Sequence, residues 1–290
     1  MVIDPSLISP VERQSLLNTL IAPRPIALVS TVDCKGKANL APYSFFGVFS
    51  INPPVVIFST VNRLRDGSLK NTLENVMEIP ETVIHIVEQE QLKQVNLCSS
   101  EFPRGVDEFD KAGFTAEPAG LVRPPMVKEC RMKMECRVTD IRALGHEPGA
   151  GNLVICEVVR LHIADSVLTG HKLELADIHY VARLGGSIYC RVGPENMFEM
   201  EKPKGKIIGF DNLPPSVRQS TVLTGHHQLM LASVQDIPGL RDASFDAVQR
   251  LVSTRPEDSE ATRVLHEQVK QLLDNGKVDS AWKLLLSDSE

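Results

Sequence analysis

The segment from Val127 to Val138 alternates apolar and charged residues, and this pattern limits what the chain can fold into more than any other. One set of alternate positions is apolar: Cys130, Met132, Met134, Cys136 and Val138. The other set is charged: Glu129, Arg131, Lys133, Glu135 and Arg137. A repeat of two residues is typical of a β-strand that packs one face on a core. The pattern predicts an antiparallel strand with a charged, solvated outer face, next to a long partner strand at Leu153–Ile163.

Strands also dominate the N-terminal third of the chain. Ile26–Val32 is rich in β-branched and small residues, and Val55–Val61 is almost wholly apolar, as in a strand buried on both faces. Between them, residues 38–49 predict a return strand that Pro42 makes irregular. Thr82–Val87 predicts a further strand.

Helical periodicity marks only three short segments of this part, at 10–21, 67–78 and 89–98. Many short strands with few helices favour a small closed antiparallel barrel over a doubly wound parallel sheet. No G-x-G-x-x-G sequence follows a strand, which argues against a dinucleotide-binding parallel sheet.

The composition changes after Arg191. Residues 194–240 predict an irregular arm with short helical pieces, and residues 258–287 predict a helical hairpin with a stop at Asn275-Gly276. The sequence therefore predicts a mainly β domain over 1–192 with peripheral helices, followed by a helical extension over 193–290.

Charge and cysteine usage exclude several classes of function. The net charge of -6 argues against a nucleic-acid partner, which would need a basic surface. No apolar run is long enough to span a membrane, and the N-terminus lacks a secretory pattern, so we expect a cytoplasmic protein without a membrane partner. None of the six cysteines forms a C-x-x-C pair, which predicts reduced thiols and no metal site.

A candidate anion site lies where the strand at Val55–Val61 leads into the 67–78 helix. Free backbone N–H groups at the start of a helix attract a negative group, and a neighbouring hydroxyl and ammonium would complete a phosphate site. The residues concerned are Ser59, Thr60, Lys70, Asn71 and Thr72. The alternative is that Ser68 or Thr72 merely caps the helix while Lys70 is solvated, and the local sequence leaves both open.

Two further clusters could hold a flat polar ligand. The first contains small and hydrogen-bonding residues, Asn39, Ala41, Pro42, Tyr43 and Ser44. The second has an arginine beside two glycines that permit close approach, in Tyr180, Arg183, Gly185, Gly186 and Tyr189. The alternatives are a sheet edge with a proline kink for the first cluster and a turn with a surface arginine for the second.

Catalytic side chains are not identifiable from the sequence. His162 and His179 are candidates for proton chemistry, but a lone histidine in a strand usually has a packing or surface role. Residues 99–126 are rich in glycine, proline and acid and predict a long, irregular loop. Its segment at 107–110 could cover a ligand, but an acidic, solvated loop is the expectation. No nucleophile and base share a recognisable local pattern.

Four segments, taken in order, resemble the flavin reductase-like family of FMN-binding split barrels. They are PRPIALVSTVDCKGKANLAPYSFFGVFSINPPVVIFS, LKNTLENV, EFPRGVDEFDKAGFT and YVARLGGSIY. The resemblance covers roughly residues 10–192 and not the 193–290 extension. It implies a six-stranded antiparallel Greek-key split barrel, usually a homodimer with FMN at the subunit interface.

The resemblance also implies roles for the candidate residues. It places Asn39, Ala41, Pro42, Tyr43 and Ser44 along the flavin ring and ribityl chain, and Ser59, Thr60, Lys70, Asn71 and Thr72 near the phosphate. Arg183 matches a turn beside the cofactor. Many members have Lys-Asp-Thr where this chain has Lys70-Asn71-Thr72, a change that keeps the hydrogen-bonding groups and removes one negative charge.

The implied activity is an FMN-dependent oxidoreductase of the NAD(P)H:flavin reductase type, which takes hydride from NADH or NADPH and passes electrons to a small-molecule or protein acceptor. The 99–114 loop would form part of the nicotinamide or acceptor entrance. Two alternatives remain at this point: a flavoredoxin-type electron-transfer flavoprotein, and a non-catalytic FMN-binding module.

Overall fold

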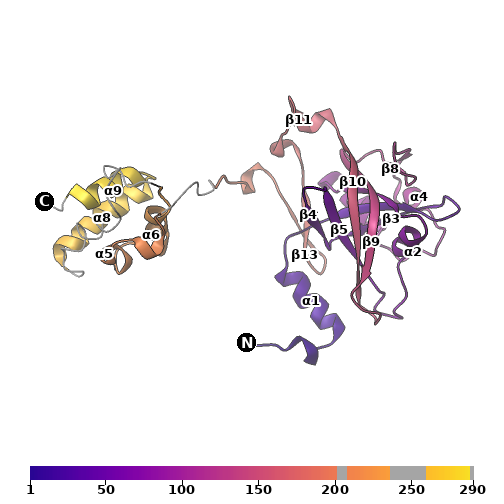
Figure 1. Cartoon of the computed structure of the whole chain (residues 1–290), viewed down its shortest axis with the longest axis horizontal. Helices are drawn as coiled ribbons and strands as arrows, with labels where there is room; N and C mark the ends of the chain where they lie inside the picture. The colour runs from indigo at the N-terminus through magenta and orange to yellow at the C-terminus, as the bar shows by residue number, and fades with distance from the viewer. Residues whose placement is uncertain (201–207, 236–258, 288–290) are drawn as a thin grey trace. The chain divides into compact units, whose positions relative to one another are not determined.

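The structure is a computed structural model of the 290-residue chain and describes residues 1–200, 208–235 and 259–287. The chain divides into two compact units, Met1–Met197 and Phe198–Glu290 (Figure 1).

A seven-stranded antiparallel sheet forms the centre of the first unit (Figure 1). Its spatial order is β3 (Ala38–Tyr43), β2 (Ala27–Val32), β6 (Glu81–Ile86), β9 (Met132–Ala143), β10 (Gly151–Ile163), β5 (Val55–Val61) and β4 (Phe46–Ser50). A smaller sheet joins β1 (Arg24–Pro25), β13 (Val181–Gly185) and β14 (Ile188–Arg191). The unit is therefore mostly β with helices, as predicted. The six-stranded Greek-key detail is not confirmed, because the large sheet has seven strands and no ladder closes it between β3 and β4.

The predicted return strand at 38–49 is in fact two strands on opposite edges of this sheet. β3 pairs with β2, whereas β4 pairs with β5. Only Ser44 and Phe45 lie between the two strands. The sequence pattern shows no break here because both halves have strand-like composition, and only the pairing partners separate them. This crossing from edge to edge positions the pocket described below.

The alternation in β9 predicts the correct faces but not their exposure. Lys133 and Glu135 are buried rather than solvated, at 8% and 0% exposed. The Glu135 carboxylate accepts a hydrogen bond from the Gly120 backbone N–H at 3.1 Å, and the Lys133 ammonium pairs with Glu117. Charged groups can be buried when each has a partner, and the segment around residues 117–120 supplies these partners.

Four helices flank the sheets of the first unit: α1 (Pro10–Leu20), α2 (Asn71–Glu78), α3 (Leu92–Leu97) and α4 (Glu108–Ala112). Two short ribbons, β7 (Ala116–Glu117) with β8 (Met126–Val127) and β11 (Leu168–Thr169) with β12 (Lys172–Leu173), complete it. α2 inserts Leu73 and Val76 into the core that contains Phe58. α1 begins with a Ser9–Glu12 capping box but buries none of its residues.

The second unit has its own core of helices, α5 (Pro215–Arg218), α6 (Gly225–Ala232), α8 (Glu260–Asp274) and α9 (Val278–Ser287). Trp282 is fully buried and donates its indole N–H to the Leu231 carbonyl at 3.1 Å. Gly276 has φ of +71°, a left-handed geometry typical of the end of a helix, between α8 and α9. Residues 201–207 and 236–240 of the predicted arm, and residue 258 of the predicted hairpin, lie outside the described residues. None of the helices in the described ranges is long and apolar enough to cross a membrane.

Candidate functional site

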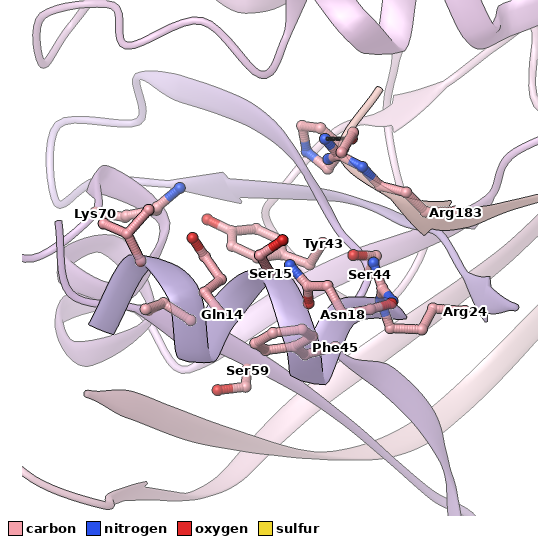
Figure 2. Close-up of a pocket in the computed structure, with 14 residues that line it drawn as sticks. Gln14, Ser15, Asn18, Arg24, Tyr43, Ser44, Phe45, Ser59, Lys70 and Arg183 are labelled. Atoms are coloured by element: carbon pink, nitrogen blue, oxygen red, sulfur yellow. Dashed lines mark hydrogen bonds between the residues drawn. The ribbon is translucent and has the colours of Figure 1, made fainter. Parts of the chain in front are cut away.

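Two adjoining cavities of about 360 and 300 Å³ lie in the first unit, beside β3 and the start of α2. Both are lined by Pro42, Tyr43, Lys70 and Arg183, so we treat them as one continuous pocket. Figure 2 shows Lys70 and Arg183 on opposite sides of the first cavity, with Tyr43 between them.

The pocket collects side chains that the sequence places in three separate clusters. Besides the four shared residues, the first cavity is lined by Ser44 and Ser59. The second is lined by Asn39, Ala41, Asn71 and Thr72. Thr60 is the exception among the predicted residues, because it lines neither cavity and is 1% exposed. Successive side chains of a strand point to opposite faces, and Ser59 already occupies the pocket side of β5.

The start of α2 is open to an anion. Lys70 is the residue before the first helical turn, and no side chain caps the helix there. The Thr72 hydroxyl instead accepts a hydrogen bond from the Asn39 amide at 2.9 Å, and the Ser68 hydroxyl donates to Asp66 at 2.5 Å. The alternative in which Ser68 or Thr72 merely caps the helix is therefore wrong. The first backbone N–H groups of α2 remain available to a negative group.

Two cations converge on this end of the pocket. Burial lowers the pKa of the Lys70 ammonium, and the neighbouring Arg63 charge lowers that pKa further. Within the described ranges no carboxylate forms an ion pair with Lys70. Arg63 lines the same cavity and is held by its own loop, because its guanidinium donates to the Ser68 hydroxyl at 3.2 Å and to the Leu69 carbonyl. An anion here would relieve repulsion between two positive charges.

Arg63 was missed at the sequence level. It follows β5 by two residues and lies in a turn that carries another arginine, and this composition alone indicates a solvated loop. Its role becomes visible only when the turn at 62–69 brings it beside Lys70.

Residues 99–107, which we name the strap, run along the second cavity. Ser99, Ser100, Glu101 and Phe102 line it, and the Phe102 carbonyl accepts from the Asn71 amide at 3.5 Å. Further along, the Arg104 guanidinium lies 2.6 Å from a Glu78 carboxylate oxygen and 3.3 Å from one of Glu74, both on α2. The strap is thus held to α2 at both its first residue, Asn71, and its last, Glu78.

Glu108 corrects the prediction that residues 107–110 are solvated. It is 4% exposed, lines the second cavity, and accepts a hydrogen bond from the Leu40 backbone N–H at 3.0 Å. Burial raises the pKa of its carboxyl group. Because β3 is an edge strand, this bond satisfies a backbone donor that has no strand partner on that side.

The opposite side of the pocket is built by Tyr43 and Arg183. Tyr43 packs its ring 5.3 Å from that of Phe58, and burial raises the pKa of its hydroxyl. The Arg183 guanidinium lies 5.5 Å from the centre of the Tyr189 ring and donates to the Gly186 carbonyl at 3.1 Å. These contacts hold one fixed cation at the end of the pocket away from Lys70 (Figure 2).

The two histidines considered from the sequence lie elsewhere. His162 Nε2 is 2.6 Å from a Glu135 carboxylate oxygen, and His179 Nδ1 is 2.5 Å from one of Glu90. Neither lines the two cavities. Both have the surface or packing role that a lone histidine usually has.

The chain is similar to known proteins over most of its first unit. The profile of the flavin reductase-like domain matches residues 20–182. An uncharacterised protein of Halalkalibacterium halodurans is 33% identical over 205 residues, which cover 70% of this chain and 97% of that protein.

Solved structures show the same fold. Nitrilotriacetate monooxygenase component B from Bacillus cereus is 31% identical with a TM-score of 0.64, over 69% of this chain and 98% of that one. A split-barrel protein of Shewanella frigidimarina assigned as a flavin reductase is 24% identical with a TM-score of 0.59, over 70% of this chain and 99% of that one. The second likeness shows the fold alone, a split barrel. Because the domain profile covers more than half of the chain, this protein belongs to the flavin reductase-like family.

Proposed function

We propose that the pocket binds FMN and that the protein is an NAD(P)H-dependent flavin reductase. One observation carries the proposal: the uncapped start of α2, the unpaired Lys70 and the fixed Arg63 all line the pocket that also contains the 41–43 segment of β3. A flavin mononucleotide has the two matching features, a terminal phosphate dianion and a flat ring.

The residues present fit this cofactor. Lys70, Arg63 and the backbone of Asn71 and Thr72 would hold the phosphate, since backbone N–H groups and two cations complement a dianion. Ala41, Pro42 and Tyr43 would lie along the ring, where small side chains and edge backbone permit close approach. Arg183 would place a positive charge at the other end of the pocket.

When bound, FMN supplies hydride acceptance from a reduced nicotinamide and electron transfer to a second acceptor. The chain contributes binding, orientation and a particular electrostatic environment. Glu108 and Tyr43 are both buried and both line the pocket, so each contributes to the environment of a bound ligand. This division of labour needs no protein nucleophile, which agrees with the lack of a recognisable catalytic triad in the sequence.

A protein acceptor is the reading that we favour for the second step. The Bacillus cereus relative at 31% identity is named as component B of a monooxygenase. By analogy, we propose that reduced flavin from this protein serves an oxygenase partner. The flavoredoxin-type alternative rests on weaker similarity, because flavoredoxin of Desulfovibrio vulgaris shares 21% identity and so supports only the fold.

We also propose a homodimer. Large apolar side chains are exposed on α1 and around β4, including Leu20 at 75%, Val48 at 67% and Ile51 at 83%. Several large apolar side chains exposed in one unit favour a protein interface, because such surface is stabilised by a partner that covers it.

An anaerobic absorbance titration tests the proposed function. The protein is loaded with FMN, freed of excess and titrated with NADH and then NADPH. We expect an FMN spectrum that bleaches with one or both nicotinamides. Flavin that bleaches only with a reduced carrier protein would favour the flavoredoxin-type alternative, and protein that takes up no FMN would refute the flavin proposal altogether.

A further inference from the structure

The anion-binding end of the pocket already contains one anion, the side chain of Glu101. Its carboxylate lies 3.6 Å from Arg63 Nε and 3.5 Å from Arg65 Nη1. Glu101 also lines the cavity that holds Lys70, Asn71 and Thr72. Its negative charge raises the pKa of the Lys70 ammonium, opposing the effects of burial and Arg63.

The contacts of this group show which partner can move. Arg63 is 16% exposed and is held by the Ser68 hydroxyl and the Leu69 carbonyl of its own loop. The Glu101 side chain is 56% exposed, and its carboxylate lies 3.6 Å from Arg63 and 3.5 Å from Arg65. Among the described residues it forms no shorter hydrogen bond. The cation is therefore preorganised, whereas the carboxylate can leave.

The strap would stay in place if Glu101 turned away. Its second fastening is independent, because Arg104 contacts Glu74 and Glu78 on α2. The Phe102 carbonyl also accepts from Asn71. Movement of one side chain is enough to exchange the anion at Arg63.

We propose that Glu101 is an internal competitor for the cofactor phosphate, so that FMN enters by displacing its carboxylate from Arg63. The inference rests on the proposed function and deepens it. A phosphate monoester carries a charge of about -1.5 to -2 at neutral pH, against -1 for a carboxylate, so it can displace Glu101 from Arg63. Its binding is weaker than it would be if Arg63 had no carboxylate partner. Glu101 thereby keeps FMN exchangeable, as a protein that hands reduced flavin to a partner requires.

The test compares Glu101→Gln with the intact chain. Glutamine keeps the size of the side chain and removes its charge. Because Glu101 is a half-exposed partner in screened ion pairs, we expect FMN to bind about 2- to 5-fold more tightly to E101Q at low salt. The gain shrinks as NaCl screens the charge. Riboflavin, which lacks the phosphate, should bind both proteins equally.

Glu90→Gln is the matched control. Glu90 has the same exposed fraction of 56% and also pairs with a basic side chain, His179, but it does not line the pocket. Flavin dissociation constants come from fluorescence titration, and inorganic phosphate alone is titrated by calorimetry. We expect E90Q to match the intact chain with every ligand.

The outcomes separate the two proposals. Equal or weaker FMN binding by E101Q would overturn the competitor role, and weaker binding would mean that Glu101 secures the strap over the cofactor. If the intact chain bound no FMN, the proposed function would fail. The inorganic phosphate titration would still show in that case whether Glu101 competes with an anion at Arg63, since tighter phosphate binding by E101Q supports this competition and unchanged binding overturns it.

Discussion

Lys70 illustrates which part of a candidate site can be proposed from the sequence and which part needs the structure. Its position before a short helix is readable from the chain, because a strand, a turn and an apolar helix face follow one another there. Whether it is solvated or aimed at a ligand depends on Arg63 and on the strap, which other segments supply. The sequence thus indicates a phosphate site, and the structure rejects the capping alternative.

Replacing Lys70 by alanine should weaken FMN binding by about 10- to 100-fold, the cost of losing a charged hydrogen-bond partner. Riboflavin binding should change little, because the lost contact is to the phosphate. Fluorescence titration with both flavins measures the difference. Lys35→Ala, at an exposed lysine in the turn between β2 and β3, provides the control and should bind FMN as the intact chain does. An equal loss of both flavins in K70A would contradict the assignment.

At the same scale, the residues that the sequence analysis missed share a physical reason. Arg63, Glu101 and Glu108 are charged residues in loops or short helices, and such residues usually face water. Glu108 is buried where its carboxylate accepts a hydrogen bond from the Leu40 N–H of β3. Long-range partners of this kind leave no periodic trace in the chain.

Among the elements, the link between β2 and β8 depends on one buried histidine. His85 is fully buried, and its Nδ1 lies 2.8 Å from the Leu28 carbonyl while its Nε2 lies 2.8 Å from the Val127 backbone nitrogen. The Val127 N–H is a donor, so Nε2 accepts and Nδ1 carries the proton. Protonation of Nε2 would break the bond to β8. Burial, with a smaller contribution from the Lys133 charge, lowers the pKa of His85 to about 3.

This arrangement predicts a specific loss of stability in mild acid. The unfolded chain binds a proton at His85 near pH 6.5, but the folded chain does not until about pH 3. The contribution of His85 to the free energy of unfolding is therefore fully present above pH 6.5. It falls by roughly 1.4 kcal/mol per pH unit below that pH. His85→Gln removes this pH dependence. The difference in free energy of unfolding between the intact chain and H85Q should therefore shrink by about 2 kcal/mol between pH 6.5 and pH 5.

Urea unfolding at pH 5, 6.5 and 8 measures the effect. His171→Gln, at an exposed histidine, should retain the slope of the intact chain. A constant gap between H85Q and the intact chain at all three pH values would show that His85 is not held neutral.

The positions of the strands could be predicted from the sequence, whereas the pairing between strands could not. β5 (Val55–Val61) has the bounds that its apolar run indicates, because a run buried on both faces has sharp ends. The 38–49 segment was predicted as one strand because composition cannot distinguish an edge-to-edge crossing from a continuous strand. Similarly, the alternation in β9 revealed its two faces, whereas the cover over Glu135 comes from a segment that has no regular pattern.

For the whole molecule, the two units have separate cores. The helical core around Trp282 contains only residues of the second unit. The Halalkalibacterium halodurans relative is matched over 97% of its own length by 70% of this chain, so the rest of the present sequence has almost no counterpart in it.

A chain ending at residue 197 should therefore fold and bind FMN with a dissociation constant within about 2-fold of the full-length value, since all the described residues that line the pocket precede residue 187. Thermal denaturation followed by circular dichroism checks the fold, and FMN titration checks the site. A chain ending at residue 186, which lacks β14, is the comparison and should be less stable. Loss of FMN binding on removal of residues 198–290 would mean that the extension takes part in the site.

The exposed helix α1 has a consequence for the lifetime of its backbone hydrogen bonds. It is 11 residues long and buries none of them, and helices of this length are marginal in water without a packed face. Its amide protons should exchange with solvent deuterium rapidly in a monomer and slowly when a second copy covers the helix. Deuterium uptake by residues 10–20 should accordingly slow as protein concentration rises, whereas uptake by β5 should not change. Uptake independent of concentration across the micromolar range would speak against the homodimer, so the exchange kinetics of ten amides, one for each residue of α1 except Pro10, report on how the entire molecule assembles.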